Sequence, residues 1–95
     1  MGQLAFNEVE KEIIPQLDIK KEEVLPDERL RQERNQLLHK AMVLGNNYKN
    51  KVKIVFQTLS GPRAVETTIW ATTDKNVILK GGIFIPVCCI LQVIF

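Results

Sequence analysis

The second half of the chain is a series of short β-prone segments separated by turn residues, and this feature limits the fold more than any other. Residues 51–58 alternate, with Val52, Ile54 and Phe56 on one face, as in a half-buried strand. Later segments are rich in Thr, Val, Ile and Trp, which suit a pleated surface. The expected strands cover residues 51–58, 64–73, 77–80, 83–85 and 90–95.

Turn residues separate these segments at short intervals. Ser60-Gly61-Pro62 predicts a turn, because Gly tolerates a positive φ and Pro has no amide donor for a ladder. Asp74-Lys75-Asn76 and Gly81-Gly82 supply the next two turns, and a proline ends the fourth segment. Five short strands joined in this way fit a meander that curls upon itself, because a flat sheet would leave two edges exposed.

A single strong helix signal, residues 27–44, precedes the strands. Pro26 and Asp27 suit its start, because Asp is a good cap and its charge is favourable at a helix N-terminus. Gly45 and the two asparagines after it are expected to end the helix, because these residues tolerate the left-handed conformation. The apolar side of the helix needs a sheet to cover, and it comprises Leu30, Leu37, Leu38, Ala41 and Met42, with Arg34 crossing the stripe.

The N-terminal segment, residues 1–26, carries a weaker signal. Phe6, Val9 and Ile13 fall at helical spacing, which fits a short helix that stops before the first proline. Three interpretations remain open: a short docking helix followed by a linker, a mobile tail, or an arm that packs on a neighbouring subunit. We expect one domain at residues 27–95, preceded by this arm or linker.

The segment from Ile85 to Ile90 resembles the junction between the last two strands of SH3-like barrels. In those folds an apolar residue and a proline, here Ile85 and Pro86, open a single 3₁₀ turn before the final strand. The order of one helix and five bent strands is also similar to that of Sm-like proteins. The resemblance implies an α+β fold in which an N-terminal helix is followed by a five-stranded, strongly bent antiparallel barrel. Because the loop signatures for uridine-rich RNA and the aromatic cluster for proline-rich peptides are missing, it does not extend to those ligands.

Charge is distributed unevenly along the chain. Residues 1–35 carry six Lys/Arg and nine Asp/Glu, a net charge of −3, whereas residues 36–95 carry seven and two, a net charge of +5. A basic half is compatible with polyanion binding. The alternative is a helix and a sheet whose solvated faces differ, and we favour it because seven positive charges alone do not indicate nucleic acid.

No motif for catalysis, a cofactor or a metal stands out. His39 is the only histidine, and no nucleophile or second ligand stands at a useful spacing from it. Cys88 and Cys89 lack zinc-site spacing and, on opposite faces of a strand, would not form an ordinary disulfide. Lys80-Gly81-Gly82 lacks the strand–loop–helix context of a phosphate-binding loop. We therefore expect a protein that is not an enzyme and holds neither cofactor nor metal.

The most apolar stretch, residues 83–95, is 13 residues long, which is short of the roughly 20 that a membrane-spanning helix needs. The N-terminal segment shows no signal-peptide pattern. Because the chain also has no disulfide framework, we expect a cytoplasmic protein that does not enter the membrane.

Two features are candidates for binding. Trp70 either points outward as an anchor for a protein partner or a nucleobase, or lies under the helix as part of the core; we favour the core, because a chain this short has little apolar volume. The second feature is a basic set that would follow a phosphate backbone or simply keep a small β protein soluble. The candidate surface comprises Tyr48, Lys49, Lys51, Lys53, Arg63, Trp70, Lys75 and Lys80.

The last predicted strand, residues 90–95, is apolar at both parities, which indicates that both of its faces are covered. One face can belong to the barrel interior, and the other needs the N-terminal segment or another subunit. The sequence thus favours a binding or assembly module that associates with a protein partner or with itself. The alternative is a small RNA- or DNA-binding protein that uses the basic hairpin around Lys51, Lys53 and Arg63.

Overall fold

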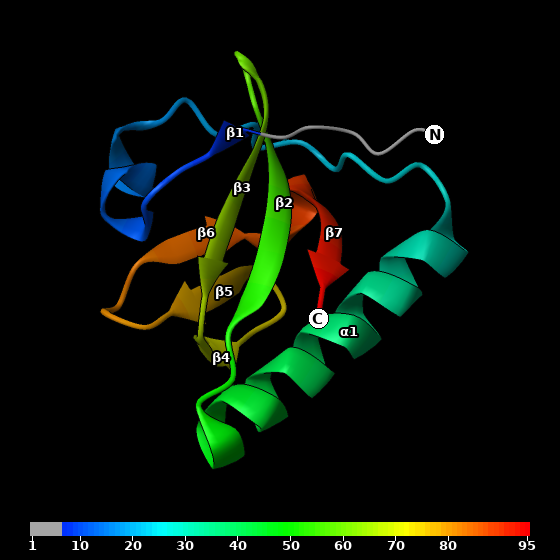
Figure 1. Ribbon diagram of the computed structural model, residues 1–95. Helices are drawn as coiled ribbons and strands as arrows, with labels where there is room; N and C mark the ends of the chain where they lie inside the picture. Colours follow the sequence, from blue (N-terminus) through cyan, green and yellow to red (C-terminus); the bar gives the residue numbers. More distant parts are fainter. Residues whose placement is uncertain (1–6) are drawn as a thin grey trace, which may run out of the picture.

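The structure, a computed structural model, describes residues 7–95 and contains one long helix and two small sheets, an α+β arrangement (Figure 1). In chain order the elements are β1 (Asn7–Glu8), the 3₁₀ helix η1 (Lys11–Gln16), α1 (Glu28–Tyr48), β2 (Val52–Thr58), β3 (Gly61–Thr67), β4 (Ile69–Thr72), β5 (Asn76–Leu79), β6 (Phe84–Pro86), the 3₁₀ turn η2 (Val87–Cys89) and β7 (Ile90–Ile94).

The two sheets share one bent stretch of chain. Their strand orders are β1-β3-β2-β7 and β4-β5-β6. Only Thr68 separates β3 from β4, so the single strand predicted at residues 64–73 bends out of one sheet and into the other. The five predicted β-segments are all present. No pairing joins β6 to β7 within the described part of the chain.

The core lies between the two sheets and α1. The inward face predicted for the strand at residues 51–58, which is β2, is confirmed, because Val52, Ile54 and Phe56 are all buried. Side chains from β4, β5, β6 and β7 meet them from the other sheet and from the final strand. The remaining core residues are Ile14, Leu38, Ala41, Val65, Ile69, Val77, Leu79, Ile85, Val87, Cys89, Ile90 and Val93.

Helix α1 extends a full turn beyond its predicted end. Asp27 caps its N-terminus, as predicted, by accepting a hydrogen bond from the Arg29 amide at 2.8 Å. Its C-cap is Lys49, in the left-handed conformation with φ 57°. The prediction that Gly45 ends the helix is wrong. A β-carbon at residue 45 would lie 2.5 Å from the carbonyl oxygen of Ile69, so this glycine lets the helix approach β4 closely.

The buried side of α1 is narrower than the predicted stripe. Leu30 and Leu37, which were expected to face the sheet, each keep 37% of their surface exposed. Met42 is partly buried and packs against the core. Successive buried positions are four, three and four residues apart, so they form a single line along the helix. Leu30 and Leu37 lie beside this line. Those buried positions are Arg34, Leu38, Ala41 and Gly45.

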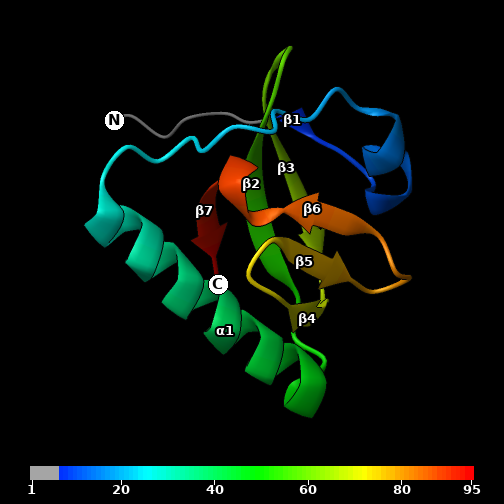
Figure 2. The same ribbon diagram turned by 180° about the vertical axis from the view of Figure 1, so that it is seen from behind.

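The N-terminal arm does not form the predicted helix. The amide of Val9 donates to the carbonyl of Ala64 at 2.8 Å, which extends β1 along the edge of β3. The 3₁₀ helix η1 then includes Pro15 instead of stopping before it, and Phe6 lies outside the described residues. Pairing with the sheet edge therefore prevails over a weak helical period. Beyond η1 the arm crosses to the start of α1 (Figure 2), and the Val24 amide donates to the Cys88 carbonyl at 2.9 Å.

The junction before the last strand is a 3₁₀ turn. Pro86 precedes η2, and β7 begins at Ile90, which confirms the predicted 3₁₀ turn. Cys88 and Cys89 both lie in this turn, so the expectation that they occupy opposite faces of a strand is wrong. Both are free thiols. Among residues 7–95, no helix is long and apolar enough to cross a membrane.

Candidate functional site

An apolar cleft of about 120 Å³ lies between the N-terminal half of α1 and β7. Leu30 and Leu37 form its helix side, and their exposed parts open onto solvent. Beyond the cleft, Ile94 and Phe95 are 38% and 51% exposed. The apolar lining comprises Leu25, Leu30, Leu37, Leu91 and Val93, with Glu33, Arg34 and Gln92 completing it.

The outer edge of β7 carries backbone groups that point away from β2. The carbonyl of Gln57 faces away from β3, because it accepts a hydrogen bond from an amide of the N-terminal arm. Val55 has the same parity as Gln57, and it pairs with Gln92 in the β2–β7 register. Since backbone direction alternates along an antiparallel strand, the N–H and C=O of Val93 face outward.

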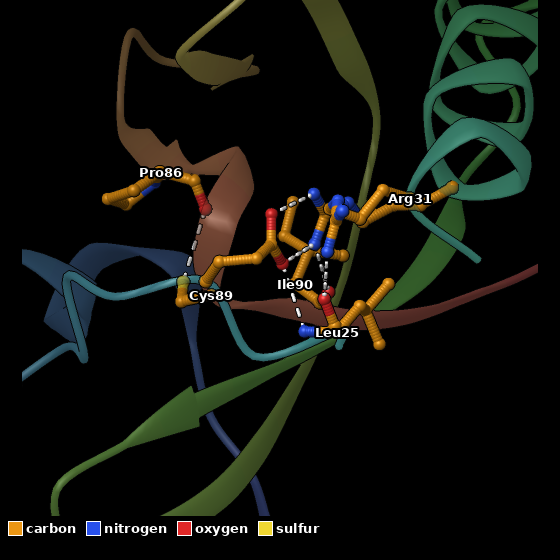
Figure 3. A network of polar contacts seen from close by, with 7 residues as sticks. Leu25, Arg31, Pro86, Cys89 and Ile90 are labelled. Carbon is orange, nitrogen blue, oxygen red and sulfur yellow. Dashed lines mark hydrogen bonds and ion pairs between the residues drawn. The ribbon is translucent and has the colours of Figure 1, made fainter. Parts of the chain in front are cut away.

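Arg34 joins the arm, the helix and β7 into one network of polar contacts. Figure 3 shows this network around Leu25, Arg31 and Ile90. The Nη1 and Nη2 atoms of Arg34 each donate to the Glu23 carboxylate at 2.7 Å, and Nη1 also donates to the Ile90 carbonyl at 3.1 Å. One helical turn away, Arg31 donates to the Leu25 carbonyl at 2.8 Å. A buried arginine is tolerated when it is paired in this bidentate way, which explains why a charged residue crosses the apolar stripe.

The same network sets the protonation of Glu23. Hydrogen bonds from Arg34 hold the pKa of the Glu23 carboxyl below its usual range, and the Leu25 amide adds a smaller effect in the same direction. The side chain of Arg34 is only 5% exposed, and its Nε atom has no hydrogen-bond partner among the described residues. The pair therefore fixes the arm against the start of β7.

Trp70 is 49% exposed on β4, so its preferred placement under the helix is wrong. The register of β4 with β5 shifts between Ile69 and Ala71, and Trp70 is the extra residue at this irregularity. Ile69 points inward and is fully buried. Because Gly45 brings the helix against the Ile69 carbonyl, no space remains there for an indole ring.

A second aromatic residue lies on the same outer face as Trp70. Ile78 pairs with Ala71 on one side and with Phe84 on the other, and paired residues of an antiparallel sheet point to the same face. Phe84 is 57% exposed. The outer face of the three-stranded sheet is therefore apolar, a feature that sequence reasoning missed, although the unbroken apolar run of residues 77–79, apolar at both parities, contained the signal.

The predicted basic surface is divided and partly neutralised. Lys53 lies 2.9 Å from the Glu8 carboxylate, and this hydrogen bond raises the pKa of the lysine. Lys51 and Lys80 are brought together in a hollow of about 370 Å³, but acidic groups share it. The charged residues that line this hollow are Glu8, Glu10, Glu66, Lys11, Lys51 and Lys80.

The other predicted basic residues lie apart from this hollow. Arg63 is half-buried on β3 and donates to the carbonyl of Pro62 at 2.9 Å. Tyr48 and Lys49 are exposed at the C-terminal end of α1. Lys75 lines a different and larger hollow, of about 630 Å³, between α1, the arm and η2. Within residues 7–95, the predicted basic residues therefore lie in separate places and form no continuous track from the hairpin.

His39 and Cys89 lie in different surroundings. His39 lines a small polar hollow with Asn35, Thr72, Thr73 and Asp74. Burial raises the pKa of the Cys89 thiol to about 12, which leaves it protonated and unreactive at neutral pH. Within residues 7–95, no three or more His, Cys, Asp or Glu side chains are grouped to hold a metal ion.

Comparison with known proteins identified no relative of this chain. No family model matches the chain, and no match was found among curated proteins or among solved structures.

Proposed function

We propose that this chain is a non-enzymatic assembly module built on a five-stranded barrel of the SH3-like or Sm-like kind, working in the cytoplasm. Support for the barrel comes from the meander order, the bend at Thr68, the 3₁₀ turn η2 and the return of β7 to pair with β2. The two free thiols favour a reducing compartment.

Self-association through β7 and the adjoining side of α1 is the activity that the surface supports best. Leu30 and Leu37 flank the strand on the helix side, and Ile94 and Phe95 are further exposed apolar side chains at the C-terminal end of the strand. The observation that carries the proposal is this group of exposed apolar side chains on α1 and at the end of β7, next to the apolar cleft. Exposed apolar patches mark interaction sites.

The test is the molar mass in solution, measured by light scattering during size-exclusion chromatography at micromolar concentration. The wild type should be larger than a monomer, and Leu37→Glu should be monomeric because it places a charge in the cleft. Leu59→Glu is the matched control, because Leu59 is 74% exposed in the β2–β3 turn, and it should associate like the wild type. Circular dichroism establishes that both variants fold. A monomeric wild type would contradict the proposal.

A second candidate function, binding of single-stranded RNA or DNA, is favoured by the exposed Trp70 and Phe84. Bases stack on aromatic side chains with little sequence preference. The hairpin is the weaker platform for this function, because Glu8 pairs with Lys53. Fluorescence anisotropy with a labelled oligonucleotide tests it. Affinity should fall steeply with salt and drop for Trp70→Ala, and absence of binding at low salt would exclude this function.

A further inference from the structure

A line of three leucines runs along α1 beside its buried positions. Leu30, Leu37 and Leu44 stand seven residues apart, and this spacing keeps side chains on one side of a helix, with a drift of only about 20° per step. The line is about 21 Å long. Leu30 and Leu37 are exposed. Leu44 is half-buried, but it is not among the side chains that pack against the core cluster. The core of the chain therefore does not account for this repeat.

Two opposite charges accompany the leucine line. Glu33 and Lys40 each follow one of its leucines by three residues. At about 100° per residue, both lie beyond the line, on the side away from the buried Arg34 and Leu38. Both side chains are exposed, and neither has an ion-pair partner in the described part of the chain. Leu37 thus has a free negative charge before it along the helix and a free positive charge after it.

The C-terminal end of β7 lies beside the same stretch of α1 (Figure 1, Figure 2). The ammonium group of Lys40 is 5.0 Å from the ring centroid of Phe95, and this ring is 51% exposed. Closer to the start of the helix, Leu30 and Leu37 form one wall of the apolar cleft. A partner that lies along the leucine line would therefore cover both the mouth of the cleft and Phe95.

The two charges distinguish between the orientations that a second copy of α1 can take on this line. A parallel copy would oppose Glu33 to Glu33 and Lys40 to Lys40, and like charges opposed in this way disfavour a contact. In an antiparallel copy related by a two-fold axis close to Leu37, Glu33 lies about 6 Å from the axis along the helix, and Lys40 of the partner copy lies about 4.5 Å from it in the same direction. Each glutamate then lies next to a lysine, while the two leucine lines still face each other.

We infer that two copies of this chain pack α1 against α1, antiparallel about a two-fold axis close to Leu37, and so form a closed dimer. The inference rests on the proposed self-association and specifies the element that makes the contact and its orientation. An isologous contact of this kind uses the same patch on both copies. It covers the leucine line and Phe95 of each copy, and it forms the Glu33–Lys40 pair twice. The contact is made by side chains of α1 and needs no free backbone edge.

Charge reversal tests the orientation. The dimer dissociation constant is measured by analytical ultracentrifugation for the wild type, Glu33→Lys, Lys40→Glu and the variant that carries both changes. Each single reversal turns two attractive pairs into two repulsive ones and should weaken the dimer by about tenfold. The double reversal restores opposite charges and should return the dissociation constant to within about threefold of the wild type. Glu22→Lys makes the same change of charge at an exposed position in the arm and should have no effect.

Disulfide cross-linking provides an independent measurement. In a Cys88→Ser background, which removes the less buried of the two native thiols, Glu33→Cys and Lys40→Cys are made singly and together. Mild oxidation should link the copies only in the variant that carries both changes. In the antiparallel dimer, position 33 of one copy lies about 12 Å along the helix from position 33 of the other, and the two positions 40 lie about 9 Å apart. Both separations exceed the roughly 7 Å between α-carbons that a disulfide can bridge.

The outcomes separate this inference from the proposed function. A dimer that the double reversal rescues, and that cross-links only through both positions together, supports the antiparallel helix contact. A dimer without this rescue, a dimer that neither single reversal weakens, cross-linking by either single cysteine variant, or an assembly larger than a dimer overturns the helix contact while self-association stands. A monomeric wild type overturns self-association itself.

Discussion

Replacement of Gly45 by alanine should have two opposite effects on the stability of the fold. In an exposed helix interior this change stabilises a protein by about 1 kcal/mol, because alanine has the higher helix propensity. Here the new β-carbon would lie 2.5 Å from the Ile69 carbonyl oxygen and 3.0 Å from Cγ2 of Thr68. Ordinary carbon–oxygen contacts begin at about 3.3 Å, so the helix and β4 must move apart by a large fraction of an ångström.

The steric effect should prevail. Overpacking typically costs about 1–3 kcal/mol, and the upper part of that range applies because the obstructing atom belongs to the backbone. After the propensity gain, Gly45→Ala should lower the free energy of unfolding by about 1–2 kcal/mol. For a domain of this size that corresponds to a fall in Tm of roughly 5–15 °C.

Urea and thermal unfolding followed by circular dichroism provide the measurement. Asn46→Ala is the control, because this residue is exposed on the same helix turn and the change should raise stability by about 0.5 kcal/mol. If Gly45→Ala were as stabilising as Asn46→Ala, the close approach of α1 to β4 would be refuted, and with it the explanation of why Trp70 is outside the core.

Four further predictions concern the arm, the thiols and the indole. Arg34→Met should cost about 2–4 kcal/mol in urea unfolding, because it leaves the Glu23 carboxylate and the Ile90 carbonyl without their donor. The stability that the Arg34–Glu23 pair contributes should also depend on pH, because the folded-state pKa of Glu23 is lowered. The loss of unfolding free energy in Glu23→Gln should be full at neutral pH and should shrink as the pH falls through the folded-state pKa of Glu23. A deficit that persisted in acid would contradict this. A thiol reagent should label Cys88 alone in the native protein and both cysteines in urea, because Cys89 is buried with a pKa of about 12; rapid native labelling of both would argue against the η2 geometry. Trp70→Ala should cost about 1 kcal/mol, well below the roughly 3–5 kcal/mol of a buried tryptophan, and acrylamide should quench the native indole fluorescence readily.

Local chemistry determined the secondary structure that could be predicted from the sequence. The inward face of residues 51–58, the cap at Asp27 and the 3₁₀ turn after Pro86 each depend on residues close together in the chain. Side-chain parity and a capping carboxylate act over one to four residues, and the turn after Pro86 was implied by the resemblance of this short segment to SH3-like junctions. The α+β class and the five β-segments therefore followed from the sequence alone.

Only the tertiary structure decided the role of residues whose partners are distant in the chain. Gly45 is required by the carbonyl of Ile69, and Arg34 is buried because Glu23 and the Ile90 carbonyl accept its hydrogen bonds. The local sequence pattern predicts a helix end at Gly45. The same kind of pattern makes Arg34 an interruption of an apolar stripe. The orientation of Trp70 and the exposure of Leu30 and Leu37 then followed from how closely α1 packs on β4 and β7. Packing between distant segments, and not the periodicity of either one, thus determined which side chains this small protein exposes on its surface.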